Sequence, residues 1–273
     1  MLKSRIITAV VLVLLLLTVM FALPDIWWTG VVVLMVMQGI LEWMKLSKFS
    51  GWGAYGYGIL TLLMMLALVW FGYKHDGDDQ QAMLHMWIYG VSAVLWLAVV
   101  PLWMRGGWRV ENPLLLGLTG WAVLIPTGLA MLDLHGISPL LLLFVMSLVW
   151  VADIGAYFSG RRFGKHKLAP SISPGKTWEG VAGAMLGVSL YVVVVWQYSP
   201  YQLQHLPVLL LASWFWVVLA VMGDLFESAI KRQAGVKDSG TLLPGHGGLL
   251  DRIDALTPTL PLAAMVMLFQ QLS

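Results

Sequence analysis

The chain has 273 residues, of which 59% are hydrophobic and 11% are charged, and its mean hydropathy is +0.82. One soluble core of this length could not bury so much apolar surface, so the composition indicates an integral membrane protein. The net charge of +2, without a basic tail or stripe, argues against a nucleic-acid partner. The absence of cysteine excludes disulfides, thiolate zinc sites and cysteine nucleophiles.

Apolar runs of about 20 residues predict nine membrane-spanning helices, at about residues 6–23, 26–44, 54–73, 85–104, 113–132, 137–160, 180–198, 205–230 and 255–272. The first resembles a signal peptide but has span length and no small-residue cleavage site, so we expect it to be retained, with a cleaved signal as the alternative. The weakest are the second, with Gln38 and Glu42, and the fifth, with Pro126. Since no linker divides the chain, we expect a single all-α, polytopic membrane domain over residues 1–273. The glycines of GWGAYGYG, near Gly51, are expected to allow close helix packing.

Basic residues divide unevenly between the two sides of these spans. With the amino terminus in the cytoplasm, 15 of the 16 Lys and Arg residues lie on the cytoplasmic side, and Lys74 alone lies on the other. Cytoplasmic loops carry such an excess. We therefore expect a cytoplasmic amino terminus, a carboxyl terminus on the outer side, and the two longest polar stretches, about 161–179 and 231–254, in the cytoplasm.

Charge is concentrated between residues 224 and 254. Asp224 and Glu227 end a long apolar run on one helical face, which Ser228 and Lys231 continue. For Glu227, an intrahelical pair with Lys231 and a functional role are both open. An ionisable group within a span usually marks function, and we apply this interpretation to Asp224.

Asp251 and Asp254 follow the flexible PGHGG segment, at the expected start of the last helix. Capping of that helix is the alternative role, because carboxylates are favoured at a helix amino terminus. Two acids with Arg252 between them exceed what capping needs. Carboxylates from two helices suit Mg²⁺, because substrate phosphates and water can complete its coordination shell. We therefore predict a metal site formed by Asp224 with Asp251 or Asp254.

The segment RRFGKHKLAPSISPGKTWEG is a basic loop that leads into a helix. It is not a P-loop, because Pro170 stands where that motif needs glycine and no strand is expected before it. Lys176 and Thr177 near a helix amino terminus, with free backbone N–H groups, nevertheless predict a phosphate seat that begins at Ser173. Contact with anionic lipid headgroups is the alternative, above all for Arg161, Arg162, Lys165 and Lys167.

Isolated polar residues carry weaker signals. Asp153 lies within a span and either joins the site or pairs with a base. His246 is flanked by glycines, where backbone can approach a ligand. Four histidines on the outer side are expected to be ordinary interfacial residues: His75, His85, His135 and His205.

The complete charged segment reads Ser228-x-Ile-Lys-Arg, four residues, Lys237-Asp-x-Gly, then Pro244-x-His-Gly-Gly-Leu-x-Asp-Arg-Ile-Asp254. This pattern resembles the carboxyl-terminal signature of the phosphatidate cytidylyltransferase (CDP-diacylglycerol synthase) family, without departure from it. The resemblance includes FGKHKLAPSISPGKTWEG and the opening MLKSRIITA, so it covers the whole chain, and it is greatest to the enterobacterial type.

The resemblance implies a nucleotidyltransferase of phospholipid biosynthesis that condenses CTP with phosphatidic acid, gives CDP-diacylglycerol and pyrophosphate, and depends on Mg²⁺. For some members it also implies a homodimer and a second, monovalent cation. It places the protein in the bacterial inner membrane, with a periplasmic carboxyl terminus and cytoplasmic active-site segments at about 161–180 and 224–254. A phosphatidate phosphate is already anionic, so its attack on CTP needs charge neutralisation and alignment rather than a general base.

Residues and resemblance together give three sets of candidates. The catalytic candidates are Asp224, Lys231, Arg232, Lys237, Asp238, His246, Asp251, Arg252 and Asp254. The substrate-binding candidates are Ser173, Lys176, Thr177, Ser228, Gly247 and Gly248. The metal candidates are Asp224, Asp251 and Asp254.

Two other functions share some of these features. A CTP-dependent lipid kinase would use a similar polar site but transfer the γ-phosphate, and the complete signature weighs against it. An ion-coupled transporter also carries acids within its helices, but here the charges cluster at cytoplasmic helix ends instead of along a midplane path.

Overall fold

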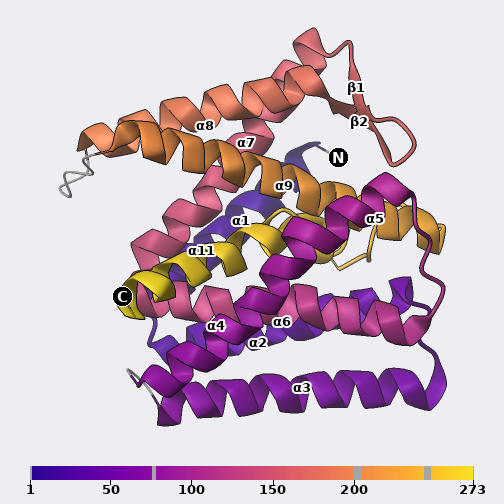
Figure 1. The fold of residues 1–273 in the computed structure, drawn as a ribbon, viewed down its shortest axis with the longest axis vertical. Coiled ribbons are helices and arrows are strands. Elements are labelled where there is room, and N and C mark those ends of the chain that lie inside the picture. Colours follow the sequence, from indigo (N-terminus) through magenta and orange to yellow (C-terminus); the bar gives the residue numbers. More distant parts are fainter. Residues whose placement is uncertain (1, 76–77, 199–204, 243–246, 273) are drawn as a thin grey trace.

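The computed structural model describes residues 2–75, 78–198, 205–242 and 247–272 as a bundle of helices with one short hairpin (Figure 1). The helices are α1 (Leu2–Ala22), α2 (Asp25–Leu46), α3 (Gly51–Lys74), α4 (Asp79–Val94), the π-helical η1 (Leu95–Val99), α5 (Val100–Gly106), α6 (Pro113–Ile137), α7 (Pro139–Phe163), α8 (Trp178–Tyr198), α9 (Leu206–Ala234), α10 (Leu250–Ile253) and α11 (Leu256–Leu272). Strands β1 (Lys167–Ala169) and β2 (Ser173–Thr177) form an antiparallel pair between α7 and α8. The predicted all-α polytopic fold is confirmed, apart from this hairpin.

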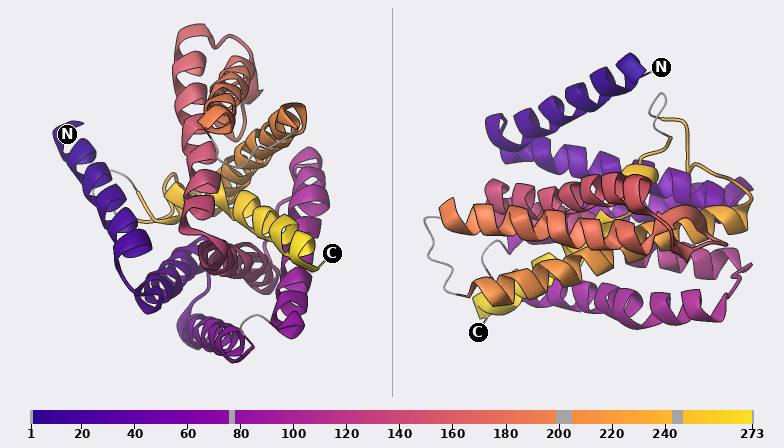
Figure 2. Two further views of the ribbon diagram at one scale, coloured as in Figure 1. Left: turned by 90° about the vertical axis from the view of Figure 1, so that its left-hand side faces the viewer. Right: turned by 90° about the horizontal axis from the view of Figure 1, so that it is seen from above.

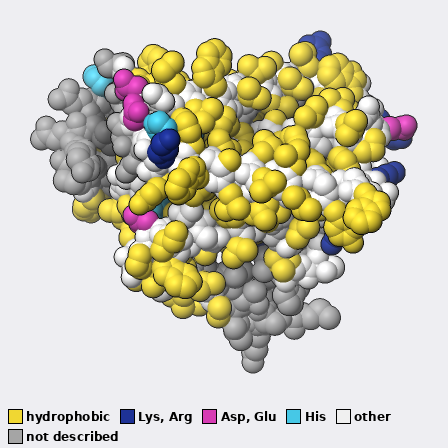
Figure 3. Space-filling view, turned by 90° about the horizontal axis from the view of Figure 1, so that it is seen from below, with side chains coloured by type: hydrophobic (Ala, Val, Ile, Leu, Met, Phe, Trp, Pro, Cys, Tyr) yellow, Lys and Arg dark blue, Asp and Glu magenta, His cyan; other side chains and the backbone are white. Residues whose placement is uncertain are grey.

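Seven segments are long and apolar enough to cross a membrane: Asp25–Leu46, Gly51–Lys74, Asp79–Gly106, Pro113–Ile137, Pro139–Phe163, Trp178–Tyr198 and Leu206–Ala234. They include both of the spans that the sequence supports least. The remaining two predicted spans are helical, but their apolar stretches in the described chain are shorter, Val13–Ala22 and Leu256–Gln270. The count of nine therefore stays a prediction. Hydrophobic side chains cover most of the face seen from below in Figure 1, and charged ones lie toward its margins (Figure 3).

Helix α11 runs through the centre of the bundle, where it packs against α4, α6, α7 and α9 (Figure 2). Residues 255–264 are buried without interruption. A helix that is apolar on all sides is buried by other helices rather than by solvent contacts on one face. Asp254, two residues before α11, is therefore held at the edge of the core.

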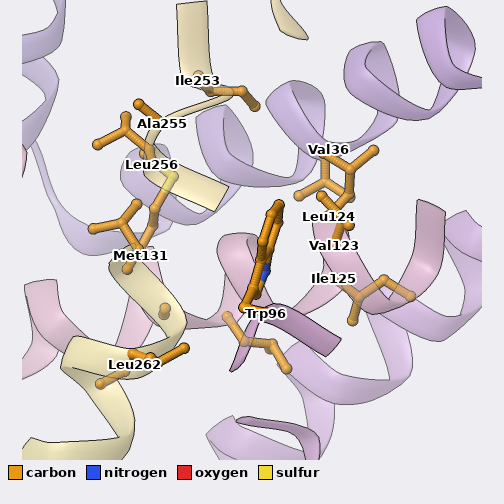
Figure 4. Packing of buried hydrophobic residues seen from close by; sticks show 14 of the residues in the cluster. Val36, Trp96, Val123, Leu124, Ile125, Met131, Ile253, Ala255, Leu256 and Leu262 are labelled. Carbon is orange, nitrogen blue, oxygen red and sulfur yellow. The ribbon is translucent and has the colours of Figure 1, made fainter. Parts of the chain in front are cut away.

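The span Asp79–Gly106 contains a π-helical stretch, η1, just ahead of Pro101. Proline has no N–H to donate to the preceding turn, and a local π-helical turn accommodates the missing bond. Trp96 lies in this stretch, fully buried beside side chains of α6 and the start of α11 (Figure 4). The irregular turn thus places one of the largest fully buried side chains of the core.

Helices α7 and α8 approach each other through small residues. A Cβ atom on Gly155 would lie 2.7 Å from the carbonyl oxygen of Gly183. Backbone contact of this kind fixes the hairpin that joins the two helices. The glycines near Gly51 do not act in this way, because Gly51 and Gly56 have open space around them; the predicted close packing there is wrong.

Candidate functional site

The predicted site residues gather where β2 and α10 each pack against α9; β2 and α9 are labelled in Figure 1. Lys176 of β2 places its Nζ 2.7 Å from Oδ2 of Asp224 on α9. The same ammonium donates a hydrogen bond to the carbonyl of Val221, at 3.5 Å. Ser228, one turn further along α9, donates to Oδ1 of Asp224 at 3.3 Å. The two polar segments that the sequence singles out thus meet through an ion pair.

Lys231 joins α9 to the signature segment. Its Nζ lies 2.6 Å from Oε2 of Glu227 and 2.5 Å from Oδ1 of Asp251, and all three side chains are buried. The intrahelical pair that was one of the two open interpretations of Glu227 is therefore present, but Lys231 shares it with an acid 20 positions away. Among the described atoms, Oε1 of Glu227 is buried without a hydrogen-bond partner.

The signature segment is folded around Asp251. Oδ2 of this residue accepts hydrogen bonds from the backbone N–H groups of Gly248 (2.8 Å) and Ser239 (3.0 Å). The Ser239 hydroxyl, 3.1 Å from the same oxygen, shares its one proton with Glu42, which lies closer at 2.8 Å. Burial raises the pKa of Asp251, but the Lys231 ammonium and the two N–H groups outweigh it and hold the pKa below its usual value. Gly247 has φ +83°, a left-handed conformation that glycine adopts without strain.

Two further carboxylates lie near this cluster. Burial, and then the negative charges of Asp224 and Glu227, raise the pKa of Asp254 well above its usual value. Asp254 does not start the last helix, as the sequence predicts, but lies between α10 and α11, where Oδ1 accepts the N–H of Ala255 at 2.8 Å. Asp153 of α7 is within electrostatic reach of Asp224, Lys176 and Arg252, which places it beside the site.

Several predicted residues lie at the margin of the cluster. Lys237, Asp238 and Arg252 are exposed. Arg232 is exposed as well and donates to the carbonyls of Ile172 and Val236. Ser173 is the first residue of β2, paired with Ala169, and Gly247 and Gly248 adjoin Asp251. His246 lies outside the described residues.

The predicted phosphate seat matches its expected form in part. Lys176 lies in β2, but it is two residues before α8 begins, near a helix amino terminus as predicted. The buried hydroxyl of Thr177 accepts the N–H of Gly180 at 3.1 Å. The N–H of Trp178 donates to the carbonyl of His166. Two of the amino-terminal N–H groups of α8 are therefore satisfied internally and are not free for a phosphate. The Lys176 side chain, rather than these two groups, supports the predicted seat.

Sequence reasoning missed other polar residues near the site. Glu42 of α2 is buried against the signature segment. In the sequence it stands out only as a polar residue that weakens a predicted span. The signal that could have identified it is an acid inside an apolar run. Glu179 accepts hydrogen bonds from the side chain and backbone of His166, which closes the hairpin onto α8.

The histidines at the opposite end were also misjudged in part. His85 is not interfacial but buried, with Nδ1 2.8 Å from Asp133, whose carboxylate also accepts the hydroxyl of Tyr89 at 2.6 Å. His135 is buried too and stacks on Trp28. These groups lie on α2, α4 and α6, away from the charged cluster.

The donor atoms were compared with the needs of a metal ion. In the described part of the chain, no three His, Asp or Glu side chains are arranged to hold a cation as they stand. Two protein carboxylates are sufficient for Mg²⁺, however, when phosphates and water complete the shell. Five acids share this cluster with three bases: Asp153, Asp224, Glu227, Asp251 and Asp254 with Lys176, Lys231 and Arg252. The excess of carboxylate oxygen fits a hard divalent cation.

Comparisons with known proteins agree with the sequence pattern. Residues 3–270 match the cytidylyltransferase family. The chain is 35% identical over 281 residues to the phosphatidate cytidylyltransferase of Haemophilus influenzae, with 96% of each chain covered. It is 38% identical over 269 residues to that of Pseudomonas aeruginosa, which covers 98% of this chain and 97% of the relative. With the Bacillus subtilis protein of the same name, identity is 42% over 134 residues, 48% of this chain and 47% of that one.

Proposed function

Because the chain belongs to the cytidylyltransferase family, matched over residues 3–270, we propose that it is a phosphatidate cytidylyltransferase of phospholipid biosynthesis. An oxygen of the phosphatidic acid phosphate attacks the α-phosphorus of CTP. The bond from that phosphorus to the β-phosphate oxygen breaks, and CDP-diacylglycerol and pyrophosphate form. The lipid substrate enters from the membrane, which is why the polar cluster lies among apolar helices.

The observation that best supports this chemistry is the ion pair between Lys176 and Asp224, which joins the hairpin to α9. The reaction needs no general base, because the attacking phosphate is already ionised. It needs cations placed against the phosphates before the transition state forms. Lys176 is half-buried and reaches the acidic cluster from outside, so it binds a substrate phosphate. Lys231 lies deeper, between Glu227 and Asp251, and orients the acids.

We propose that Mg²⁺ is held by Asp224 with Asp254, and that it neutralises the triphosphate when bound. Burial, and then the charges of Asp224 and Glu227, raise the pKa of Asp254, so its ionised form would gain from a bound cation. Both oxygens of Asp251 already accept hydrogen bonds, which favours Asp254 as the second ligand. A second, monovalent cation and a homodimer stay predictions that rest on the resemblance.

A product assay tests the activity. Purified protein in detergent, given phosphatidic acid, Mg²⁺ and CTP labelled on the α-phosphate, should yield labelled CDP-diacylglycerol and unlabelled pyrophosphate. Label on the γ-phosphate should leave with pyrophosphate. Transfer of the γ-label to lipid would instead identify a lipid kinase, and no consumption of CTP under any condition would refute the proposal.

We further propose a place in the bacterial inner membrane, with the amino terminus and the charged cluster cytoplasmic and the carboxyl terminus periplasmic. The support is the division of Lys and Arg between the two sides of nine spans. An alkaline phosphatase fused after Ser273 should be active, whereas the same enzyme fused after Gly107, in the predicted cytoplasmic loop, should be inactive. The opposite result after Ser273 would remove one span from the count.

A further inference from the structure

Glu42 carries a buried carboxylate that the proposed reaction does not use. It lies near the carboxyl end of α2, with 1% of its surface exposed, and is 197 positions from Ser239. Burial of an acid inside a membrane bundle is costly unless hydrogen bonds compensate it. Its hydrogen-bond partners therefore indicate what this buried carboxylate does.

Four donors converge on this carboxylate, and three of them belong to the signature segment. Oε2 accepts the hydroxyl of Ser239 at 2.8 Å and the N–H of Leu250 at 2.9 Å. Oε1 accepts the N–H of Leu249 and the side-chain amide of Gln38, each at 2.9 Å. All four groups donate, so the position requires a side chain that only accepts. Glutamate meets that requirement, and glutamine does not, because its amide nitrogen would face two donors.

The same contacts continue to Asp251. Ser239, which donates its hydroxyl to Glu42, also donates its backbone N–H to Oδ2 of Asp251 at 3.0 Å. Gly248 donates to that oxygen too, and a Cβ atom on Gly248 would clash with Oε2 of Glu42. The backbone of the signature is thus enclosed between two carboxylates, one from α2 and one from α10.

We propose that Glu42 is a positioning residue of the transfer reaction: through Ser239 and the backbone of residues 248–250, it holds the signature segment so that Asp251 meets Lys231. It touches no substrate. This inference rests on the proposed function, and it adds α2 to the elements on which the reaction depends.

The test compares Glu42→Gln with Gln38→Ala. Loss of a residue that orients an active-site side chain through hydrogen bonds is expected to cost about 10- to 100-fold in activity, the range found for the partners of metal ligands. We expect Glu42→Gln to lower kcat by about that factor, with KM for CTP and for phosphatidic acid within about threefold of the wild type. Gln38→Ala removes a donor to the same carboxylate without touching the signature, and should keep kcat within about twofold.

A purely structural role would lower the yield of folded protein and leave kcat per folded enzyme unchanged, which would overturn the proposal. Should Glu42→Gln not fold, Ser239→Ala decides, because the proposal requires a lowered kcat in that variant and a wild-type kcat refutes it. If both fold, the double variant should lose little more than Glu42→Gln alone, since both act through one contact; additive losses would contradict this. An inactive wild type would refute the proposed function instead.

Discussion

Asp224→Asn should lower turnover by at least about 100-fold, equivalent to about 2.8 kcal/mol at about 1.4 kcal/mol per factor of ten. The substitution keeps the size of the side chain but removes the anionic oxygen that pairs with Lys176 and is proposed to hold Mg²⁺. Asp251→Asn should be similarly inactive, because one amide cannot accept both from Lys231 and from the two backbone N–H groups. Both are measured as kcat for CDP-diacylglycerol formation at saturating Mg²⁺.

The matched control is Asp25→Asn. Asp25 is also a carboxylate on a membrane helix, but its side chain is 92% exposed at the start of α2. Its loss should change kcat by less than about twofold. All three variants should elute as monodisperse protein and unfold near the wild-type temperature. Near-normal activity of both site variants, with ordinary Mg²⁺ dependence, would place the metal elsewhere.

Lys176→Gln should lower turnover by roughly 30-fold or more. Its ammonium is half-buried against Asp224, and one preorganised charge on a phosphate is worth about 2 to 4 kcal/mol in the transition state. Arg161→Gln and Arg162→Gln should each cost less than about tenfold. Both are exposed, Arg161 interacts with the neighbouring Tyr157, and salt screens such charges.

The comparison is made on one lipid composition, with kcat and KM determined for both substrates. Lys237, which the sequence places with Lys176, is exposed, so we expect Lys237→Gln to lie between the two groups. If the arginine variants were inactive and Lys176→Gln were normal, the nucleotide would have to lie against the amino-terminal end of the hairpin segment.

The helices could be predicted from sequence because the bilayer sets their length and excludes charge. The site segments could be found for the same reason, since charges in such a chain are expensive and must be compensated. Pairings between distant segments could not be predicted. Nothing local indicates that Lys176 meets Asp224, or that Glu42 accepts hydrogen bonds from residues about 200 positions later.

The hairpin escaped prediction because Pro174 and Gly175 are poor strand formers. Its strands exist because β1 and β2 pair with each other and Glu179 binds His166 at the base. The expectation that the outer-side histidines are interfacial failed for a similar reason. His85 is buried because its ring nitrogen pairs with Asp133, 48 positions away. In each case a tertiary partner overrides a local preference.

The central place of α11 also has a consequence for biogenesis. Ribosomes deliver the chain from its amino terminus, so α4, α6, α7 and α9 enter the bilayer before the helix that they enclose. Until α11 arrives, lipid or translocon must occupy its place between them. The residues that lead into α11 include Asp251 and Asp254, so assembly of the bundle and completion of the polar cluster are one late step of synthesis.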